Sequence, residues 1–280
     1  MNKKVALARL KAAISEGRAI VGGGAGSWIT AKAETEAGCD VIIVYGTGKY
    51  RMAGRSSMAG RFGFGDANEI VYDMAKEIAH VTGDIPLVAG VALQDPHRDM
   101  ERFFYQLMEA GYTGIQNIPG MGGMIQMEGE WVMQLLEEQN LGLNFEYDCL
   151  KLANKCGMLT TPYAYNLEQA IGLASIGCDM ICMHAGLTAK GLQKTSNITP
   201  IDQCAENLAK WVEAIRKENP DTIILCHGGP ISEPEDFVYM KKHVSGIDGF
   251  YGASSIERIP VENAFIKTMG ELRKIRRTNK

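Results

Sequence analysis

The fold class is indicated by residues 41–79, which read VIIVYGTGKYRMAGRSSMAGRFGFGDANEIVYDMAKEIA. This segment begins with β-branched residues, Val41 to Val44, which predict a buried strand. It ends with apolar residues at helical spacing that follow Asp66, a predicted N-cap. A strand that leads into a helix is the repeating unit of α/β folds, so we expect more such units along the chain.

The connection between this strand and this helix is about 20 residues long, well beyond the usual length of such connections. It contains aromatic and methionine side chains that can pack, and it carries Arg51, Arg55 and Arg61. Its six glycines permit tight turns and a close approach to a ligand. This composition predicts an ordered segment that closes over a small anionic molecule, and an oligomer contact is the alternative.

Eight apolar runs of strand length follow one another along the chain. They cover residues 19–21, 41–44, 86–93, 114–118, 159–163, 179–183, 222–226 and 249–252. Continuous apolar runs are typical of parallel strands that helices cover on both faces. Eight strand–helix units predict one (β/α)8 TIM barrel over residues 1–280, with an extra N-terminal helix near residues 5–14. The alternative is an open doubly wound sheet, although Gly22–Gly26 lack the GxGxxG spacing.

Composition limits the partners of the chain. The net charge is -4, which gives no general attraction to nucleic acid or to an anionic membrane. No apolar run approaches the roughly 20 residues of a membrane span, and no signal peptide is visible. The seven cysteines form no pair of CxxC units, so we expect free thiols and a cytoplasmic protein.

In a TIM barrel the active face is the rim at the carboxyl ends of the strands. His184 and His227 end neighbouring strands in the matching contexts MICMHAG and IILCHGG. Imidazole transfers protons near neutral pH, so we expect these two residues to be catalytic, although a buried structural histidine is the alternative for each. Asp95 ends the third strand and can act as a base, hold Mg²⁺ or cap the next helix.

The remaining polar rim residues predict a binding site for a small anion. The turns after the last two strands contain Gly228, Gly229, Ser254 and Ser255, followed by Arg258, and such turns bind phosphate in many TIM barrels. Ordinary turn chemistry and helix capping by Ser255 are the alternative. The other predicted substrate-binding residues are Gly24, Tyr45, Arg51 and Asn117. The chain has no HExxH, GxSxG or P-loop motif, so nothing supports a zinc protease, serine hydrolase or NTPase.

Several segments together resemble one known family, the phosphoenolpyruvate hydrolase-like or TIM-barrel signal transduction proteins. They are YGTGKYRMAGRSSMAGRFGFGDAN, VALQDP, IQNIPGMG, LTTPYAYN, MHAGLT and GFYGASSIERIP, and they span about residues 20–260. The resemblance extends to the phosphoenolpyruvate/pyruvate barrel superfamily of mutases and carbon–carbon lyases. It implies a small oxoacid or enol phosphate as substrate, and either hydrolysis or cleavage of a carbon–carbon bond next to a carbonyl.

The same resemblance implies Mg²⁺ as a cofactor, with Asp95 as the candidate ligand, and a homo-oligomer. The chain has Asp95 alone where those enzymes have paired aspartates, and it lacks their KKCG-type loop. No organic cofactor is expected. The signalling members of the family imply a second possibility, a barrel that senses a metabolite without turning it over.

Overall fold

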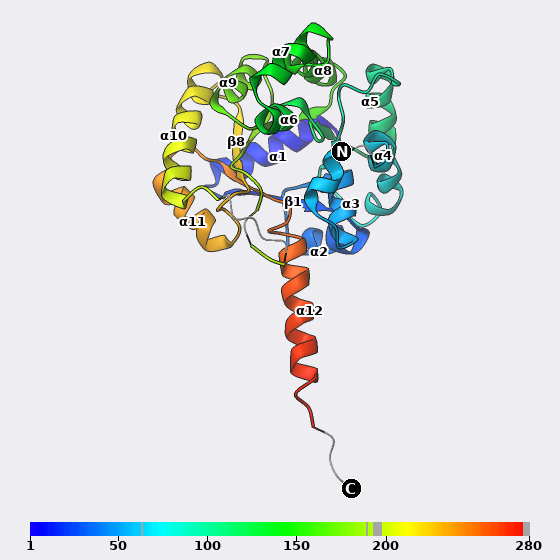
Figure 1. Ribbon diagram of the computed structural model, residues 1–280, viewed down its shortest axis with the longest axis vertical. Coiled ribbons are helices and arrows are strands. Elements are labelled where there is room, and N and C mark those ends of the chain that lie inside the picture. The colour runs from blue at the N-terminus through cyan, green and yellow to red at the C-terminus, as the bar shows by residue number, and fades with distance from the viewer. Residues whose placement is uncertain (63, 189, 193–197, 277–280) are drawn as a thin grey trace.

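A parallel sheet curls into a barrel at the centre of the molecule, and helices surround it (Figure 1). The computed structural model describes residues 1–62, 64–188, 190–192 and 198–276. The strands are β1 (Ile20–Ala25), β2 (Val41–Val44), β3 (Leu87–Gly90), β4 (Gly114–Gln116), β5 (Leu159–Thr160), β6 (Tyr163–Ala164), β7 (Met180–His184), β8 (Ile223–His227) and β9 (Gly249–Gly252).

Helices follow most of the strands. They are α1 (Lys3–Ser15), α2 (Trp28–Glu36), α3 (Gly46–Met52), η1 (a 3-10 helix, Ser57–Arg61), α4 (Ala67–Ile78), α5 (Met100–Glu109), α6 (Met121–Glu128), α7 (Glu130–Glu138), α8 (Leu143–Lys155), α9 (Leu167–Ser175), α10 (Ile201–Glu218), α11 (Pro234–His243) and α12 (Arg258–Leu272). The predicted barrel with an N-terminal helix is confirmed.

The barrel closes through one strand that is divided in two. The strand order is β5-β4-β3-β2-β1-β9-β8-β7-β6, and all pairs are parallel. The predicted fifth strand is β5 and β6, separated by Thr161 and Pro162. The Thr161 amide donates to Ile115 on the β4 side, whereas the Pro162 carbonyl accepts from Cys182 on the β7 side. Proline has no N–H of its own, so the chain changes partner at this point and joins the two edges of the sheet.

Apolar side chains fill the inside of the barrel, and α1 closes its amino end. Leu10 and Ala13 of α1 belong to the same buried cluster as Ile20, Val41 and Met180, which lie at or near the starts of their strands. The polar residues lie at the other end of the barrel, where the strands end. This arrangement puts any active site at the carboxyl ends of the strands.

Three local predictions need correction. The first strand was predicted at residues 19–21, but it continues through the glycines to Ala25. Glycine is required at position 22, because an added Cβ would lie 2.2 Å from the ring of Tyr251 inside the barrel. The long connection after β2 was predicted to be a loop, but it contains α3 and η1. Its glycines and methionines predict a loop at residues 119–127, but most of this segment is helical in α6.

The last helix, α12, does not lie against the barrel along its length. It leaves the barrel near β1 and α2 and points into solvent (Figure 1). In the described part of the chain, no helix is both long and apolar enough to span a bilayer.

Candidate active site

A small cavity of about 40 Å³ lies at the carboxyl ends of β2, β7, β8 and β9, beneath α3 and η1. Its lining residues are Tyr45, Thr47, Arg51, Ser57, Arg61, Ile118, Tyr163, His184, Gly186, Leu187, Thr188, His227, Ala253 and Ser254. Pockets for drug-sized ligands and organic cofactors occupy roughly 300–1,000 Å³, so this cavity suits a much smaller ligand. We call it the histidine cavity.

The two predicted histidines meet in this cavity. The parallel register of β7 and β8 places His184 directly beside His227, with their ring centroids 4.8 Å apart. Tyr163 packs against both rings, at 5.1 and 5.2 Å, and fixes their orientation. Both imidazoles are buried, with at most 7 % of either residue exposed.

The hydrogen bonds of the two rings define opposite roles for them. The Nδ1 atom of His184 accepts a hydrogen bond from the Gly186 amide, at 3.1 Å, so the proton of the neutral ring lies on Nε2. The Nδ1 atom of His227 donates to the carbonyl of Tyr251, so its Nε2 carries a free lone pair. One ring therefore presents a donor and the other an acceptor.

Burial keeps both rings neutral. It lowers the pKa of His184 well below the usual value, and the neighbouring His227 and Arg61 lower it further. Burial also lowers the pKa of His227 to about 4, against the opposing effect of its bond to Tyr251. At neutral pH His184 can therefore stabilise a negative oxygen and His227 can accept a proton.

Arg51 was predicted to bind the substrate, but the structure already gives it an anionic partner. Its guanidinium forms an ion pair with Glu257 at 2.7 Å, and both side chains are almost completely buried. Glu257 also accepts hydrogen bonds from the Gly26 amide and the Thr30 hydroxyl. Arg51 lines the cavity, but its charge is neutralised there, so we assign it a structural role.

Among the described residues that line the cavity, Arg61 provides a positive charge with no carboxylate partner. It comes from η1, and its only side-chain hydrogen bond in the described structure goes to the Tyr165 hydroxyl, at 3.2 Å. No carboxylate of a described residue lies within ion-pair distance of its guanidinium, unlike that of Arg51. An anionic ligand in the histidine cavity can therefore pair with Arg61.

Hydroxyl groups complete the polar wall. Ser57 of η1 and Ser254 after β9 lie 3.4 Å apart, oxygen to oxygen, although they are almost 200 positions apart in the chain. The buried Thr47 hydroxyl has no hydrogen-bond partner in the described structure. Because an unpaired buried hydroxyl is costly, a polar ligand at this position is favourable.

Asn117 was predicted to bind substrate, and the structure instead places it in the wall of the barrel. Its side-chain oxygen accepts from the Tyr163 amide at 2.7 Å, and its amide group donates to Glu146 at 2.6 Å and to the Tyr163 carbonyl at 3.3 Å. The side chain thus replaces strand hydrogen bonds between β4 and β6. Glu146, omitted from the predicted site, is fully buried and also accepts from Gln94 and the Met121 amide.

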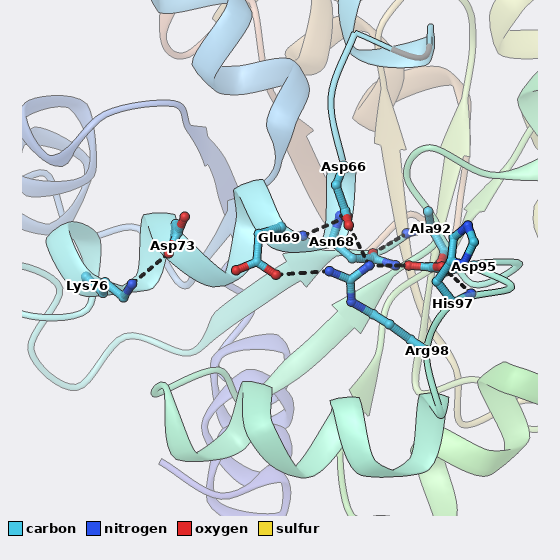
Figure 2. Close-up of polar contacts among 9 residues, drawn as sticks. All are labelled: Asp66, Asn68, Glu69, Asp73, Lys76, Ala92, Asp95, His97 and Arg98. Atoms are coloured by element: carbon cyan, nitrogen blue, oxygen red, sulfur yellow. Dashed lines mark hydrogen bonds and ion pairs between the residues drawn. The ribbon is translucent and has the colours of Figure 1, made fainter.

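Asp95 lies outside the histidine cavity, in a network of paired charges (Figure 2). It accepts hydrogen bonds from the Asn68 side chain, the His97 amide and Arg98. Arg98 also pairs with Asp66 and Glu69, and the figure shows these groups converging between α4 and the start of α5. Asp95 faces a separate, open pocket of about 440 Å³ rather than the histidines.

Some of the other predicted binding residues lie at the histidine cavity, and the rest lie outside it. Tyr45 and Ser254 line the cavity, and Gly24 lies just below it, where an added Cβ would be 3.1 Å from the Tyr45 hydroxyl. Gly228 and Gly229 pack on the turn after β7, where side chains would meet the carbonyls of Gly186 and Ala185. Ser255 and Arg258 are outside the cavity lining, and Arg258 pairs with Glu262 and the Lys190 carbonyl.

The donor groups of the cavity do not fit Mg²⁺. This ion prefers carboxylate and carbonyl oxygens, whereas the cavity presents imidazoles, hydroxyls and a guanidinium. The nearby buried carboxylates, Glu146 and Glu257, are already saturated by hydrogen bonds from the chain. Across the residues described, no cluster of three or more His, Cys, Asp or Glu side chains could hold a metal ion.

Sequence reasoning therefore missed several cavity residues, chiefly Arg61, Thr47, Ser57 and Thr188. Arg61 was visible as one of three arginines in the segment after β2. What distinguishes it is that no residue in the described part of the chain gives it an anionic partner, which depends on contacts with distant segments. No pattern within the segment could have supplied that information.

Comparison with known proteins identifies the family of this chain. The family model described as "Phosphoenolpyruvate hydrolase-like" matches residues 5–275. The "ToMV susceptible protein tm-1(GCR26)" of Solanum lycopersicum is 42% identical over 271 residues, and the match covers 97% of this chain and 35% of that protein. This chain thus spans about a third of the length of that curated relative.

Solved structures show the same fold at low sequence identity. The 2,3-dimethylmalate lyase of the PEP mutase/isocitrate lyase superfamily matches with a TM-score of 0.58 and 13% identity, over 98% of this chain and 90% of that one. Oxaloacetate acetylhydrolase matches with a TM-score of 0.59 and 14% identity, over 93% and 85%. These two likenesses support the fold alone, whereas the family match extends over nearly the whole sequence. The chain belongs to the phosphoenolpyruvate hydrolase-like family.

Proposed function

We propose that this protein is an enzyme that acts on a small oxoacid or an enol phosphate in the histidine cavity. The observation that carries the proposal is the pair of neutral imidazoles with opposite hydrogen-bonding roles beside the unneutralised Arg61. The family description supports the same class of substrate.

The proposed mechanism uses only groups of the chain. The anion pairs with Arg61 and accepts hydrogen bonds from Thr47, Ser57 and Ser254. Nε2 of His227 removes a proton, either from an attacking water molecule or from a substrate hydroxyl next to the bond that breaks. Nε2–H of His184 donates to the oxygen on which negative charge develops.

Two reactions fit this arrangement. In hydrolysis, the activated water attacks the phosphorus of an enol phosphate such as phosphoenolpyruvate, the bond from phosphorus to the enol oxygen breaks, and phosphate and an enolate are released. In carbon–carbon cleavage, the deprotonated hydroxyl becomes a carbonyl while the adjacent carbon–carbon bond breaks, and its electron pair forms an enolate. In both reactions His184 and Arg61 stabilise the enolate oxygen. We expect α3 and η1 to move when substrate enters, because the cavity of about 40 Å³ is smaller than a three-carbon phosphate.

The test is turnover of phosphoenolpyruvate and of a panel of 2-oxo and 2-hydroxy acids, each with Mg²⁺ and with EDTA. We expect one of them to be converted, with little change on addition of EDTA. His184→Asn should lower that rate at least 100-fold, because asparagine can still accept from the Gly186 amide but has no donor at the position of Nε2. A full panel without turnover, or an unchanged rate in His184→Asn, would contradict the proposal.

A metabolite sensor is the second candidate, because the depressed pKa values of both histidines would also suit a neutral hydrogen-bonding site. A sensor would be stabilised against heat by one acid of the panel without converting it. Thermal shift and product analysis on the same samples separate the two functions.

A further inference from the structure

A larger pocket borders the histidine cavity. It is the pocket of about 440 Å³ that Asp95 faces, and we call it the outer pocket. Its volume is typical of a small-molecule site, whereas the histidine cavity of about 40 Å³ holds little more than the reacting atoms of a substrate. Of the residues that line the outer pocket, the mechanism proposed above uses Arg61 alone. This pocket therefore has room for a part of the substrate that does not react.

The two spaces share one wall, formed by α3, η1 and the residues after β4. In α3, Thr47 lines the histidine cavity and Tyr50 lines the outer pocket. After β4, Ile118 lines the histidine cavity and Pro119 lines the outer pocket. Arg61, at the end of η1, lines both. A ligand can therefore extend from one space into the other beside Arg61 once α3 and η1 move.

The side chain of Arg61 can turn toward such a ligand at small cost. Its guanidinium donates to the Tyr165 hydroxyl at 3.2 Å and lies over the same ring, 5.4 Å from the centroid. In the described structure this is its one side-chain hydrogen bond. Tyr165 in turn packs against His184, with 4.7 Å between the ring centroids. A carboxylate that pairs with Arg61 is thus placed close to His184.

Large apolar side chains surround much of the outer pocket. They are Tyr50, Phe62, Ile70, Pro119, Met121 and Met124. Phe62 is 58 % exposed, so a ligand that covers its ring removes apolar surface from water. Methionine side chains are flexible and adapt to the shape of a bound group. This wall favours a hydrocarbon group.

The polar groups of the outer pocket are already paired with one another. The Asn68 side chain donates to Asp95. Arg98 forms ion pairs with three carboxylates (Figure 2), those of Asp66, Glu69 and Asp95. Three carboxylates around one guanidinium leave an excess of negative charge, which disfavours a second acid group on the ligand. The chemistry of the pocket thus selects an uncharged apolar occupant.

We propose that the substrate is a 2-oxo acid with an uncharged apolar side chain. Its carboxylate pairs with Arg61 and its oxo group accepts from His184 in the histidine cavity, while its side chain fills the outer pocket. The inference rests on the proposed function, because it uses the same cavity and the same two residues. It makes Tyr50, Ile70 and Met124 the residues that select among acids, and it disfavours dicarboxylic substrates.

The first experiment measures the affinity of a matched series of 2-oxo acids by isothermal titration. From 2-oxobutanoate through 2-oxopentanoate to 2-oxohexanoate, the dissociation constant should fall about fourfold with each methylene. The control is 2-oxoadipate, which has the same number of carbons as 2-oxohexanoate but a carboxylate in place of the terminal methyl group. It should bind at least about 10-fold more weakly than 2-oxohexanoate.

The outcome separates this inference from the proposed function. If the short acids bind but affinity does not rise along the series, or if 2-oxoadipate binds more tightly than 2-oxohexanoate, the side-chain site is overturned and the proposed reaction stands. If none of the acids binds, both are overturned.

The second experiment changes the charge of the outer pocket. Met124→Lys should reverse the preference between 2-oxohexanoate and 2-oxoadipate, with a change in their affinity ratio on the order of 100-fold. Ala67→Lys, which adds the same charge from half-buried α4, should shift the ratio in the same direction. Met133→Lys is the matched control, because Met133 is a half-buried methionine of α7 that lines neither space, and it should keep the wild-type ratio. Circular dichroism verifies folding, and an unchanged ratio in both pocket variants would refute the proposal.

Discussion

The two sides of the barrel rim both contain buried polar residues, but the hydrogen bonding of these residues differs between the sides. On the side of β7, β8 and β9, His184 and His227 each make one directed hydrogen bond to the backbone through Nδ1 and keep Nε2 for the cavity. On the side of β3 and β4, the side-chain oxygens of Asp95 and the amide group of Asn117 all form hydrogen bonds to neighbouring residues. The first side can bind a ligand, and the second side holds the barrel together.

This difference shows that polarity at the end of a strand does not identify a functional residue. Buried polar groups must be hydrogen-bonded, and a network of them can satisfy itself. The informative feature is a group whose hydrogen-bonding capacity the fold leaves partly unused. We call the part of the rim at β7, β8 and β9 the open side and the part at β3 and β4 the saturated side. Each prediction below tests whether a residue belongs to one or the other.

The largest effect is expected for His227→Asn on the open side. Asparagine can still donate to the Tyr251 carbonyl, but it has no basic nitrogen at the position of Nε2. Turnover of the substrate found in the panel should fall by roughly 10²–10⁴-fold. His243→Asn is the matched control, because His243 also contacts a backbone carbonyl but is exposed on α11. Equal losses in both variants would argue against a catalytic role.

Asn117→Ala on the saturated side should act on stability. The change removes three hydrogen bonds and leaves the buried Glu146 with fewer donors, so the free energy of unfolding should fall by about 2–4 kcal/mol. Urea denaturation measures this. Asn144→Ala provides the control, since Asn144 is exposed and bonds to Glu137 at the surface, and it should cost less than about 0.5 kcal/mol. If Asn117→Ala lowers the free energy of unfolding only slightly, Asn117 would have to be assigned to the open side.

The open side should also make stability depend on pH. His227 has a pKa of about 4 in the folded protein and about 6.5 in the unfolded chain. As the pH falls below 6.5, the unfolded chain takes up a proton that the folded protein does not, so stability present at pH 7 is lost between pH 6.5 and 4. The difference corresponds to about 3 kcal/mol. Urea unfolding at a series of pH values should show a shallower decline in His227→Asn than in His243→Asn; parallel curves would contradict the assignment.

The fold was predictable from local patterns, whereas the site was only partly so. Continuous apolar runs such as Val41–Val44 reveal parallel strands because burial on both faces imposes them. The strand register then brings His184 beside His227, as expected from their matching contexts. The partners of Arg51 and Asn117 lie 206 and 46 positions away along the chain, so no local pattern indicates that these groups are already paired.

Arg61→Met tests the cation of the open side. Methionine keeps much of the volume but removes the charge, so affinity for the anionic ligand should fall by about 10- to 100-fold, with little change in unfolding free energy. Isothermal titration with the ligand identified in the panel measures this. Arg55→Met is the control in the same segment, because Arg55 is exposed and does not line the cavity. If the two variants bind equally well, Arg61 is not the anion-binding group.

Asp95→Asn should have the smallest effect, although an aspartate at a strand end is an attractive catalytic candidate. Asparagine retains the shape, and its Oδ1 can still accept from the His97 amide, but its amide group replaces the oxygen that accepts from Asn68 and Arg98. Arg98 keeps its ion pairs with Asp66 and Glu69. Turnover should change less than about twofold, and unfolding free energy by about 1 kcal/mol or less, since the pair with Arg98 is partly solvated. A 100-fold loss of turnover without a loss of stability would show that this network opens when substrate binds. The open side of the rim would then include Asp95 and the end of β3.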